Sequence, residues 1–221
     1  MKIAIISDSK VNAGGSFHVT LSAFEFFRSV KFQDIECDFI VTQKLAYERL
    51  LKIKGGNLKF LNQNSFRFKL SSYLYRNSFI KIFYQKFLIK NYFESFINKN
   101  QYDLVFFITP SNLLLLCNKT KFIYTIWEFA HKQYPSMPEY DENTISNRDK
   151  LYNYACNNAF KIILFNEKSK EDFIKYYLLD SSKINTFFFA PHLSNAKEDN
   201  FLELEKKIKN KKYIFYPAQF W

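Results

Sequence analysis

Short apolar runs alternate along this chain with longer stretches in which apolar residues recur every three or four positions. A run such as Asp103–Ile108 ("DLVFFI") is short and uninterrupted, which is typical of a strand buried on both faces of a sheet. From Ser16 onward the apolar positions instead fall on one face of a helix. Seven runs are predicted to be strands: Lys2–Ile6, Ile35–Thr42, Leu58–Leu61, Asp103–Ile108, Phe122–Ile126, Lys161–Phe165 and Ile184–Phe189.

Helical patterns occupy most of the intervals between these runs. The predicted helices begin at Ser16 and span Leu45–Ile53, Asn77–Ile97, Ile145–Ala159 and Ser169–Tyr177. Strands that alternate with helices favour a parallel sheet that is covered on both faces. We therefore predict an α/β fold, a Rossmann-like doubly wound and mainly parallel sheet, over residues 1–191. Ligands of such sheets bind beyond the carboxyl ends of the strands, so residues that follow each strand carry most weight.

The pattern changes after Pro191. Residues 192–211 combine a polar loop with a short charged helix and are predicted to be a linker. At the end of the chain, Tyr213–Tyr216 is a run of strand-favouring residues, and Pro217 ends it. A further strand is therefore predicted at the end of the sequence.

The composition allows a sizeable core, with 48% hydrophobic residues, and the net charge is +11. A basic balance suits nucleic acid, an anionic membrane surface or phosphorylated substrates, but a lysine-rich bias of AT-rich coding gives the same balance. No recognised nucleic-acid-binding module accompanies the charge, so we predict no nucleic-acid partner. Cys37, Cys117 and Cys156 are widely spaced and are predicted to be reduced core residues of a cytosolic protein.

The loop after the first predicted strand contains "NAGGS". Gly14 and Gly15 would let the backbone approach a ligand, and the helix that begins near Ser16 would offer unpaired N–H groups to an anion. The spacing matches neither a dinucleotide-binding nor a nucleoside-triphosphate motif. The loop is therefore a candidate phosphate site, and a tight turn without a ligand is the alternative.

The segment "YTIWEFAHKQYP" begins on the fifth predicted strand and runs into the loop beyond it. Trp127, Glu128 and His131 would lie together at the ligand-facing edge. A carboxylate and an imidazole there can position a hydroxyl, accept its proton or bind a sugar. The structural alternative is a hydrogen-bonded pair beneath a loop. No histidine has partners at a metal-binding spacing, so no metal site is predicted.

The segment "LFNEKSKEDF" follows the sixth predicted strand. Asn166 and Glu167 are candidates to face the cleft. Ser169 is expected to cap the next helix, with Asp172 completing a capping box.

The segment from Arg67 to Phe93 has six Lys/Arg residues and no acidic one, and its aromatic residues recur at helical spacing. It could lie on anionic lipid, with Lys81, Lys86 and Lys90 toward the phosphates. An ordinary core helix with a solvated lysine face is the alternative. No apolar run approaches the length of a membrane span, so we expect a cytoplasmic protein, peripheral at most on the inner face of the plasma membrane.

Four segments, taken in order, resemble landmarks of the retaining glycosyltransferases of the GT-B fold, the "group 1" family. "IAIISDSKVNAGGSFHVTLS" looks like the opening glycine loop of that family, and "YTIWEFAHKQYP" resembles its "HDLQH..YPE" segment. "ILFNEKSKEDFIKYY" is similar to its "VSE.SK.DI...Y" segment. "YIFYPAQFW" looks like the start of the second domain.

The resemblance implies a two-lobed enzyme of which this chain is the N-terminal, acceptor-side lobe. Residues 212–221 would be the first strand of a truncated, donor-binding C-terminal domain, and the fragment alone is expected to be inactive. The implied reaction transfers a sugar with retention from a nucleotide-sugar to a glycan or lipid-linked acceptor, in cell-surface polysaccharide or lipopolysaccharide biosynthesis. No metal or other cofactor is implied. A non-catalytic module that binds a membrane surface or an anionic ligand is the alternative.

The resemblance also assigns roles. Gly14 and Gly15 would approach the donor diphosphate, and Gln219 lies where related enzymes often have an arginine near the phosphates. Glu128 falls on the aspartate of "HDLQH" and His131 on its second histidine. Trp127 replaces the first histidine, which is a departure from the family pattern.

Overall fold

The computed structural model describes residues 1–9, 15–30, 32–53, 55–76 and 90–187, together with residues 209 and 212. The chain divides into one unit from Met1 to Pro191 and another from His192 to Trp221. All helices and strands of the described residues belong to the first unit. The predicted linker and the predicted terminal strand lie outside the described residues, so both stay predictions.

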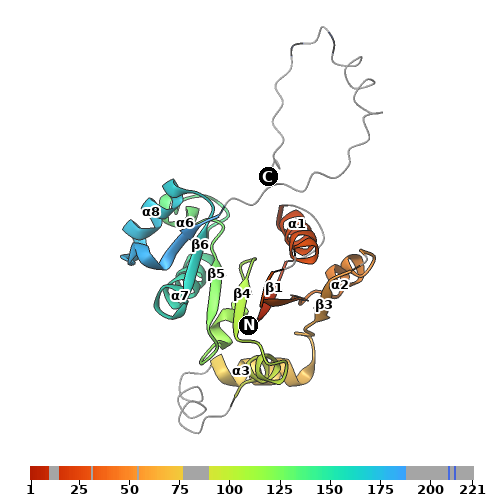
Figure 1. Cartoon of the computed structure of the whole chain (residues 1–221). Helices are drawn as coiled ribbons and strands as arrows, with labels where there is room; N and C mark the ends of the chain where they lie inside the picture. Colours follow the sequence, from red (N-terminus) through yellow and green to blue (C-terminus); the bar gives the residue numbers. More distant parts are fainter. Residues whose placement is uncertain are drawn as a thin grey trace. The chain divides into compact units, whose positions relative to one another are not determined.

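Seven strands form one sheet in the order β3–β2–β1–β4–β5–β6–β7, and every neighbouring pair is parallel (Figure 1). The order reverses between β1 and β4, which is the signature of a doubly wound sheet. The predicted α/β, Rossmann-like fold is therefore confirmed. The strands are β1 Lys2–Ser7, β2 Glu36–Val41, β3 Asn57–Phe60, β4 Leu104–Phe107, β5 Phe122–Thr125, β6 Lys161–Leu164 and β7 Ile184–Thr186.

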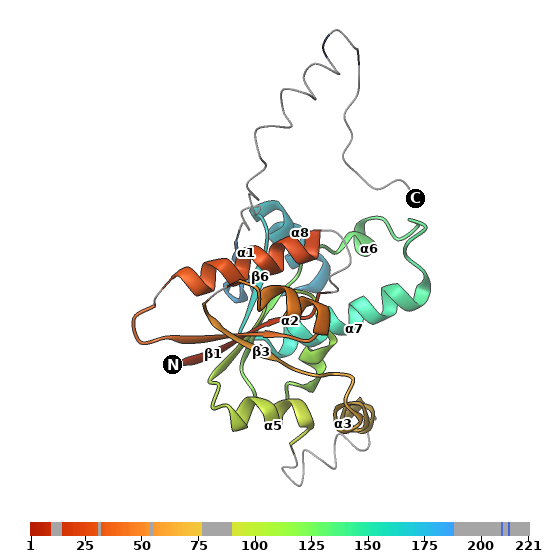
Figure 2. The same cartoon turned by 90° about the vertical axis from the view of Figure 1, so that its right-hand side faces the viewer.

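The central strands β4 and β5 are almost wholly apolar because helices cover both faces of the sheet. On one face, α1 (Gly15–Ser29) and α2 (Lys44–Leu50) bury a cluster that includes Ile5, Phe24 and Phe39. Phe24 of α1 meets Phe39 of β2 edge to face, with ring centroids 5.2 Å apart. Figure 2 shows α1 on one side of the sheet and α5 on the other.

The larger cluster lies on the opposite face. Phe93, Phe107 and Phe122 are fully buried there, and Cys117 and Cys156 are free thiols in the same core. The covering elements are α3 Phe66–Arg76, α5 Tyr92–Lys99, η1 Asn112–Leu116, α7 Glu142–Asn158 and α8 Glu167–Tyr177. Two short elements, α6 Ala130–Gln133 and η2 Ser181–Lys183, complete the described chain.

Helix α8 begins earlier than the sequence predicts. Its N-cap is Asn166, whose side chain accepts a hydrogen bond of 2.7 Å from the backbone N–H of Ser169. Ser169 is therefore inside the first turn, and the predicted Ser169 capping box is wrong. The chain leaves β6 at Leu164 and must turn at once, so the first polar side chain able to cap takes that role.

Helix α3 overlaps the start of the basic segment Arg67–Phe93, but its bounds do not match any of the predicted helices. It buries Phe68 and Tyr75 on one side but carries exposed Phe66 and Tyr73 on the other, so no single apolar stripe marks it in the sequence. The predicted helix Asn77–Ile97 overlaps α5 at its end, and its first thirteen residues lie outside the described part. Among the helices of the described residues, none has the length and apolar character needed to span a lipid bilayer.

A buried carboxylate joins the amino-terminal half of the sheet. Asp38 of β2 accepts a 2.6 Å hydrogen bond from the hydroxyl of Tyr102 and pairs with Lys59 at 2.8 Å and with Lys2 at 3.8 Å. Burial acts to raise the pKa of Asp38, but the hydrogen bonds from Lys59 and Tyr102 outweigh it and hold the pKa below its usual range. The network therefore ties β1, β2, β3 and the start of β4 together.

We expect Tyr102→Phe to lower the free energy of unfolding by about 1.5–3 kcal/mol, since it removes a hydrogen bond to a buried carboxylate. The folded pKa of Asp38 lies below the unfolded one, so this stabilisation is present above the unfolded pKa and is lost as pH falls through the folded pKa. Urea denaturation at neutral and stepwise lower pH measures both effects. Tyr73→Phe, at an exposed tyrosine, is the control, and equal stability of the two variants would contradict the network.

Candidate functional site at the carboxyl ends of the strands

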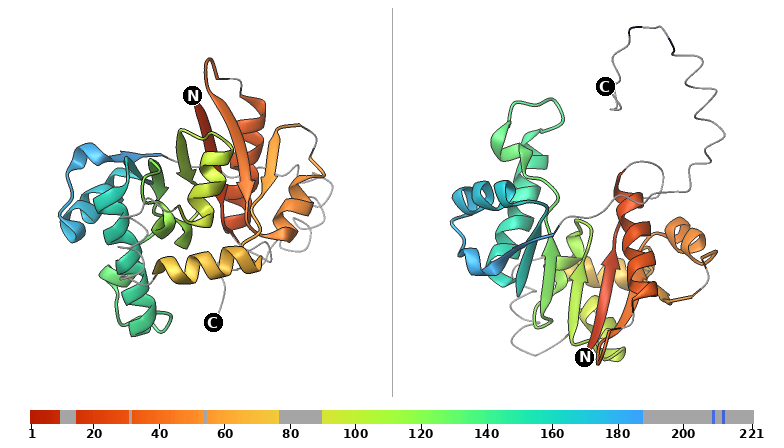
Figure 3. Two further views of the ribbon diagram at one scale, coloured as in Figure 1. Left: turned by 90° about the horizontal axis from the view of Figure 1, so that it is seen from below. Right: turned by 45° about the horizontal axis from the view of Figure 1, so that its top comes forward.

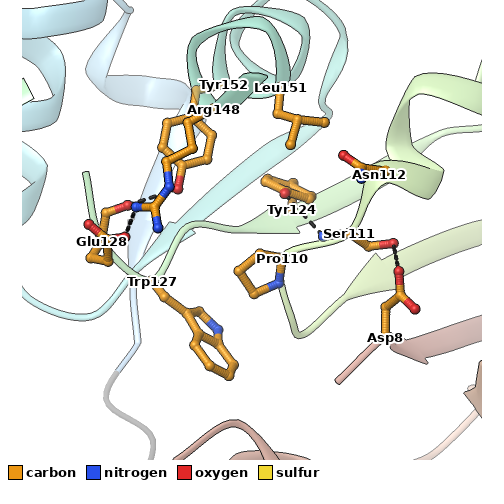
Figure 4. A pocket seen from close by; sticks show the side chains of 10 residues that line it. All are labelled: Asp8, Pro110, Ser111, Asn112, Tyr124, Trp127, Glu128, Arg148, Leu151 and Tyr152. Atoms are coloured by element: carbon orange, nitrogen blue, oxygen red, sulfur yellow. Dashed lines mark hydrogen bonds and ion pairs between the residues drawn. The ribbon is translucent and has the colours of Figure 1, made fainter. Parts of the chain in front are cut away.

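A pocket of about 390 Å³ opens at the carboxyl ends of β1, β4 and β5 (Figure 4). This is the point where the strand order reverses, and doubly wound sheets bind their ligands there. Loops after the strands supply most of the walls, and α7 supplies one side. The lining residues are Asp8, Pro110, Ser111, Asn112, Tyr124, Trp127, Glu128, Arg148, Leu151 and Tyr152.

Asp8 follows β1 directly and connects the loops around the pocket. Its Oδ1 accepts hydrogen bonds from the hydroxyl of Thr42 and from Nε2 of Gln63, the latter at 3.0 Å. Its Oδ2 accepts one from the hydroxyl of Ser111 at 2.7 Å. Thr42, Gln63 and Ser111 follow β2, β3 and β4, respectively. One carboxylate therefore fixes the segments that leave four neighbouring strands.

Two buried hydroxyl groups also hold the backbone of these loops. The backbone N–H of Asp8 donates to the hydroxyl of Thr109 at 2.7 Å, and that of Ser111 donates to the hydroxyl of Tyr124 at 3.2 Å. Burial raises the pKa of Tyr124, so its hydroxyl stays protonated at neutral pH. The floor of the pocket is thus uncharged, and its charge lies in the side walls.

Glu128 follows β5 and forms the opposite wall. Its Oε1 pairs with Nη1 of Arg148 on α7, and its Oε2 accepts hydrogen bonds from the backbone N–H of Ala130 at 2.7 Å and from the hydroxyl of Tyr140 at 3.3 Å. Its carbonyl oxygen accepts a further bond of 2.8 Å from Tyr152. Even so, 44% of the Glu128 side chain is exposed, which leaves the carboxylate accessible to a ligand.

Figure 4 shows Asp8 and Glu128 on opposite sides of the pocket, with Pro110 and Trp127 between them. The indole N–H of Trp127 donates to the carbonyl of Ile108 at 3.1 Å, which fixes the orientation of the ring. Carboxylates accept hydrogen bonds from hydroxyl groups, and an aromatic face packs against the C–H surface of a sugar ring. The walls therefore suit a polyhydroxylated ligand.

The pocket offers little to an anion. Arg148 is the one cation among the described residues that line it, and Glu128 already pairs with it. Asp8 adds a second carboxylate on the other side. The pocket therefore favours an uncharged ligand over a phosphorylated or carboxylated one. Within the described part of the chain, His, Cys, Asp and Glu side chains do not converge in threes on a possible metal position.

His131 lies behind the pocket wall and does not line the pocket. Its side chain is fully buried, with Nε2 located 3.2 Å from Oδ1 of Asp149 and 3.4 Å from the hydroxyl of Tyr177. Burial lowers the pKa of His131, although Asp149 opposes this effect. Lys132 pairs with the same carboxylate at 2.7 Å. A direct catalytic role for His131 stays a prediction, and its contacts favour a role in holding the loop on α7.

Asn166 and Glu167, the other predicted cleft residues, do not line the pocket. Asn166 is occupied as the cap of α8, and Glu167 accepts a hydrogen bond from the hydroxyl of Thr186. Glu167 also pairs with Lys170 at 3.8 Å. Their contacts are those of a helix start beside β7.

The predicted phosphate loop is described only in part. Gly15 and Ser16 open α1, and the carbonyl of Ser16 accepts a bond of 2.8 Å from the hydroxyl of Thr20. A Cβ on Gly15 would meet no atom within 4 Å, so the space in front of it is open. Gly14 and Gln219 lie outside the described residues.

Two of the three predicted membrane-facing lysines, Lys81 and Lys86, also lie outside the described residues. Lys90 is exposed, next to the Asn91 cap of α5. Its contact with lipid stays a prediction.

Sequence reasoning overlooked two residues that shape the site. Asp8 had a usable signal, because it is the charged residue that ends the first apolar run, at the edge where ligands bind. Arg148 had no such signal in the sequence, because its neighbours on α7 do not indicate which loop the helix faces. Trp127 and Glu128, which the strand-end rule singled out, line the pocket, and their functional roles stay predictions.

Solved structures share this fold. Alr3699/HepE from Anabaena in complex with UDP matches with a TM-score of 0.57 and 13% identity over 95% of this chain and 51% of its own. The complex of the same protein with UDP-glucose gives a TM-score of 0.56, also at 13% identity, covering 95% and 50% of the two chains. A glycosyltransferase from Rickettsia africae matches with a TM-score of 0.50 and 15% identity over 96% and 50%.

These matches confirm the predicted resemblance to glycosyltransferases at the level of the fold. The chain spans about half the length of the structures that it matches. No family model matches its sequence, and no curated protein does.

We expect Arg148→Met to loosen the loop from 129 to 141, because it removes the ion pair that attaches Glu128 to α7. Amide hydrogen exchange followed by mass spectrometry should show faster exchange in this loop, with β1 and β4 still protected. Lys150→Met, at an exposed lysine of the same helix, is the control. Unchanged exchange in Arg148→Met would contradict the role assigned to the pair.

Proposed function

We propose that this chain is the acceptor-side lobe of a glycosyltransferase that moves a sugar from a nucleotide-sugar to a hydroxyl group of a glycan or lipid-linked acceptor. The observation that carries the proposal is the pair of carboxylates, Asp8 and Glu128, that face one pocket at the switch point of the sheet. Support comes from the shared fold with a protein crystallised with UDP and UDP-glucose and with a glycosyltransferase.

In this proposal the acceptor sugar lies against Trp127, and its hydroxyl groups donate to Asp8 and Glu128. Glu128 is the accessible carboxylate, so it orients the attacking hydroxyl and takes up its proton. A bond forms between the acceptor oxygen and the anomeric carbon as the bond from that carbon to the diphosphate breaks. Attack from the face of the leaving group gives the proposed retention of configuration.

The leaving diphosphate needs positive potential. A helix N-terminus offers N–H groups and the positive end of the helix dipole to an anion, and α1 begins at Gly15 with open space in front of it. The proposal places the phosphates there, in agreement with the role inferred for Gly14 from the sequence. It involves no metal or other cofactor.

The donor nucleotide would need a second lobe. Support for this is the coverage, since the chain spans about half the length of the structures it matches. We propose that residues 212–221 begin that lobe and that the 221-residue chain alone does not transfer sugar. The proposed setting is synthesis of a cell-surface polysaccharide or lipopolysaccharide on the cytoplasmic side of the membrane.

Glu128→Gln should lower the turnover of the complete two-lobed protein by about 10²–10⁴-fold, because it removes the group that accepts the proton but preserves its size. The assay measures transfer from a panel of labelled UDP-sugars, and NMR of the product reports the anomeric configuration. Glu142→Gln, at the exposed start of α7, is the matched control. Equal turnover in Glu128→Gln and the control would leave a non-catalytic binding module as the better account.

His131→Ala distinguishes the two roles open to that residue. A side chain that holds the loop predicts a lower melting temperature and lower turnover together, since the change leaves a cavity beside Asp149 and Tyr177. Direct catalysis predicts a further loss of turnover, about 10²–10⁴-fold, even at temperatures well below the melting transition, where the variant is folded. Thermal unfolding and the transfer assay, on the same preparation, therefore decide between the two roles.

A further inference from the structure

Helix α3 is apolar on two opposite faces, and the described residues cover only one of them. Phe68 and Tyr75 are 5% and 2% exposed and pack into the core beside α5 and η1. Successive helix positions are about 100° apart, so Phe66, Leu70 and Tyr73 share the opposite face. These three side chains are 78%, 46% and 76% exposed. Seen from below in Figure 3, α3 (gold) runs along the periphery of the described unit.

The charged residues beside this apolar stripe on α3 are both basic. Arg67 and Lys69 are exposed and fall on either side of the stripe formed by Phe66, Leu70 and Tyr73. We call these five residues the α3 outer face. Between Glu48 and Glu94 the sequence contains no Asp or Glu, so no neighbouring carboxylate in the chain order neutralises the two cations.

We propose that the α3 outer face docks on the surface of an anionic phospholipid bilayer. The side chains of Phe66, Leu70 and Tyr73 would enter the boundary between headgroups and acyl chains. Arg67 and Lys69 would contact lipid phosphates. The helix would lie in the plane of the membrane surface. This binding is separate from the pocket and does not depend on the proposed transfer reaction.

Other occupants fit this face less well. A second copy of the chain, paired face to face through a two-fold axis, would bring Arg67 and Lys69 of both copies together, and like charges repel. Nucleic acid binds chiefly through neutralised phosphates, whereas apolar and aromatic side chains outnumber the cations here. An anionic lipid surface satisfies both the apolar stripe and the two flanking charges.

The experiment measures co-sedimentation of the 221-residue protein with vesicles of phosphatidylcholine alone and with vesicles that are roughly 3:1 phosphatidylcholine to phosphatidylglycerol. Two double variants alter the face: Phe66→Ser with Tyr73→Ser, and Arg67→Glu with Lys69→Glu. Circular dichroism melting shows whether each variant is folded, which is expected because all four side chains are exposed.

Matched controls separate this face from the general positive charge of the chain. Phe160→Ser removes an aromatic ring that is 57% exposed elsewhere. Lys150→Glu with Lys175→Glu makes the same change in net charge on α7 and α8, at two exposed positions. Both controls should bind anionic vesicles nearly as the unaltered protein does.

We expect binding to the anionic vesicles only, weakened by salt, and a loss of about tenfold or more in each α3 double variant. Absence of binding by the unaltered protein would overturn the proposal. So would an equal loss in the α3 charge variant and the α7–α8 control, because the net charge would then explain the binding. Light scattering that shows dimers dispersed by Phe66→Ser with Tyr73→Ser would assign the face to a second copy instead.

Discussion

The hydrogen bonds to the carboxylate of Asp8 are the constraint on which the rest of the site depends. The carboxylate accepts hydrogen bonds from residues that follow β2, β3 and β4. A hydrogen bond to a charged group contributes about 1.5–3 kcal/mol to stability, which is more than a bond between neutral groups. The carboxyl ends of parallel strands lie at one edge of the sheet, but the hydrogen bonds between the strands do not fix the loops that follow them. Asp8 supplies that order on one side of the pocket, and the pair of Glu128 and Arg148 supplies it on the other.

The sequence was sufficient for the sheet and insufficient for the side chains that connect its loops. Buried strands such as β4 and β5 stand out because both of their faces must be apolar, and alternation with helices dictates parallel pairing. The bounds of helix α3 were not predicted, because its exposed face is as apolar as its buried one. Glu128 was found from its place after a strand, whereas Arg148 reaches it from 20 residues further on. Such pairings depend on tertiary packing that no local pattern encodes.

The positive net charge and the candidate sugar site belong to different parts of the molecule. The pocket has two carboxylates and one paired arginine among its lining residues, so its local balance is acidic. Two exposed basic residues, Arg67 and Lys69, instead flank the exposed apolar stripe of α3. One chain can therefore bind a neutral, hydroxyl-rich ligand in the pocket and an anionic surface at α3. The two sites share no residue, so an experiment can contradict one proposal and leave the other unaffected.

The most direct test of the central claim, that the pocket between Asp8 and Glu128 binds a sugar, is an NMR titration of the isotope-labelled chain with neutral mono- and disaccharides. A sugar bound in the pocket should move the amide shifts of Asp8, Ser111, Asn112 and Glu128. Uronic acids of the same size should move them less. Shifts confined to other surfaces, or none at saturating sugar, would contradict the claim.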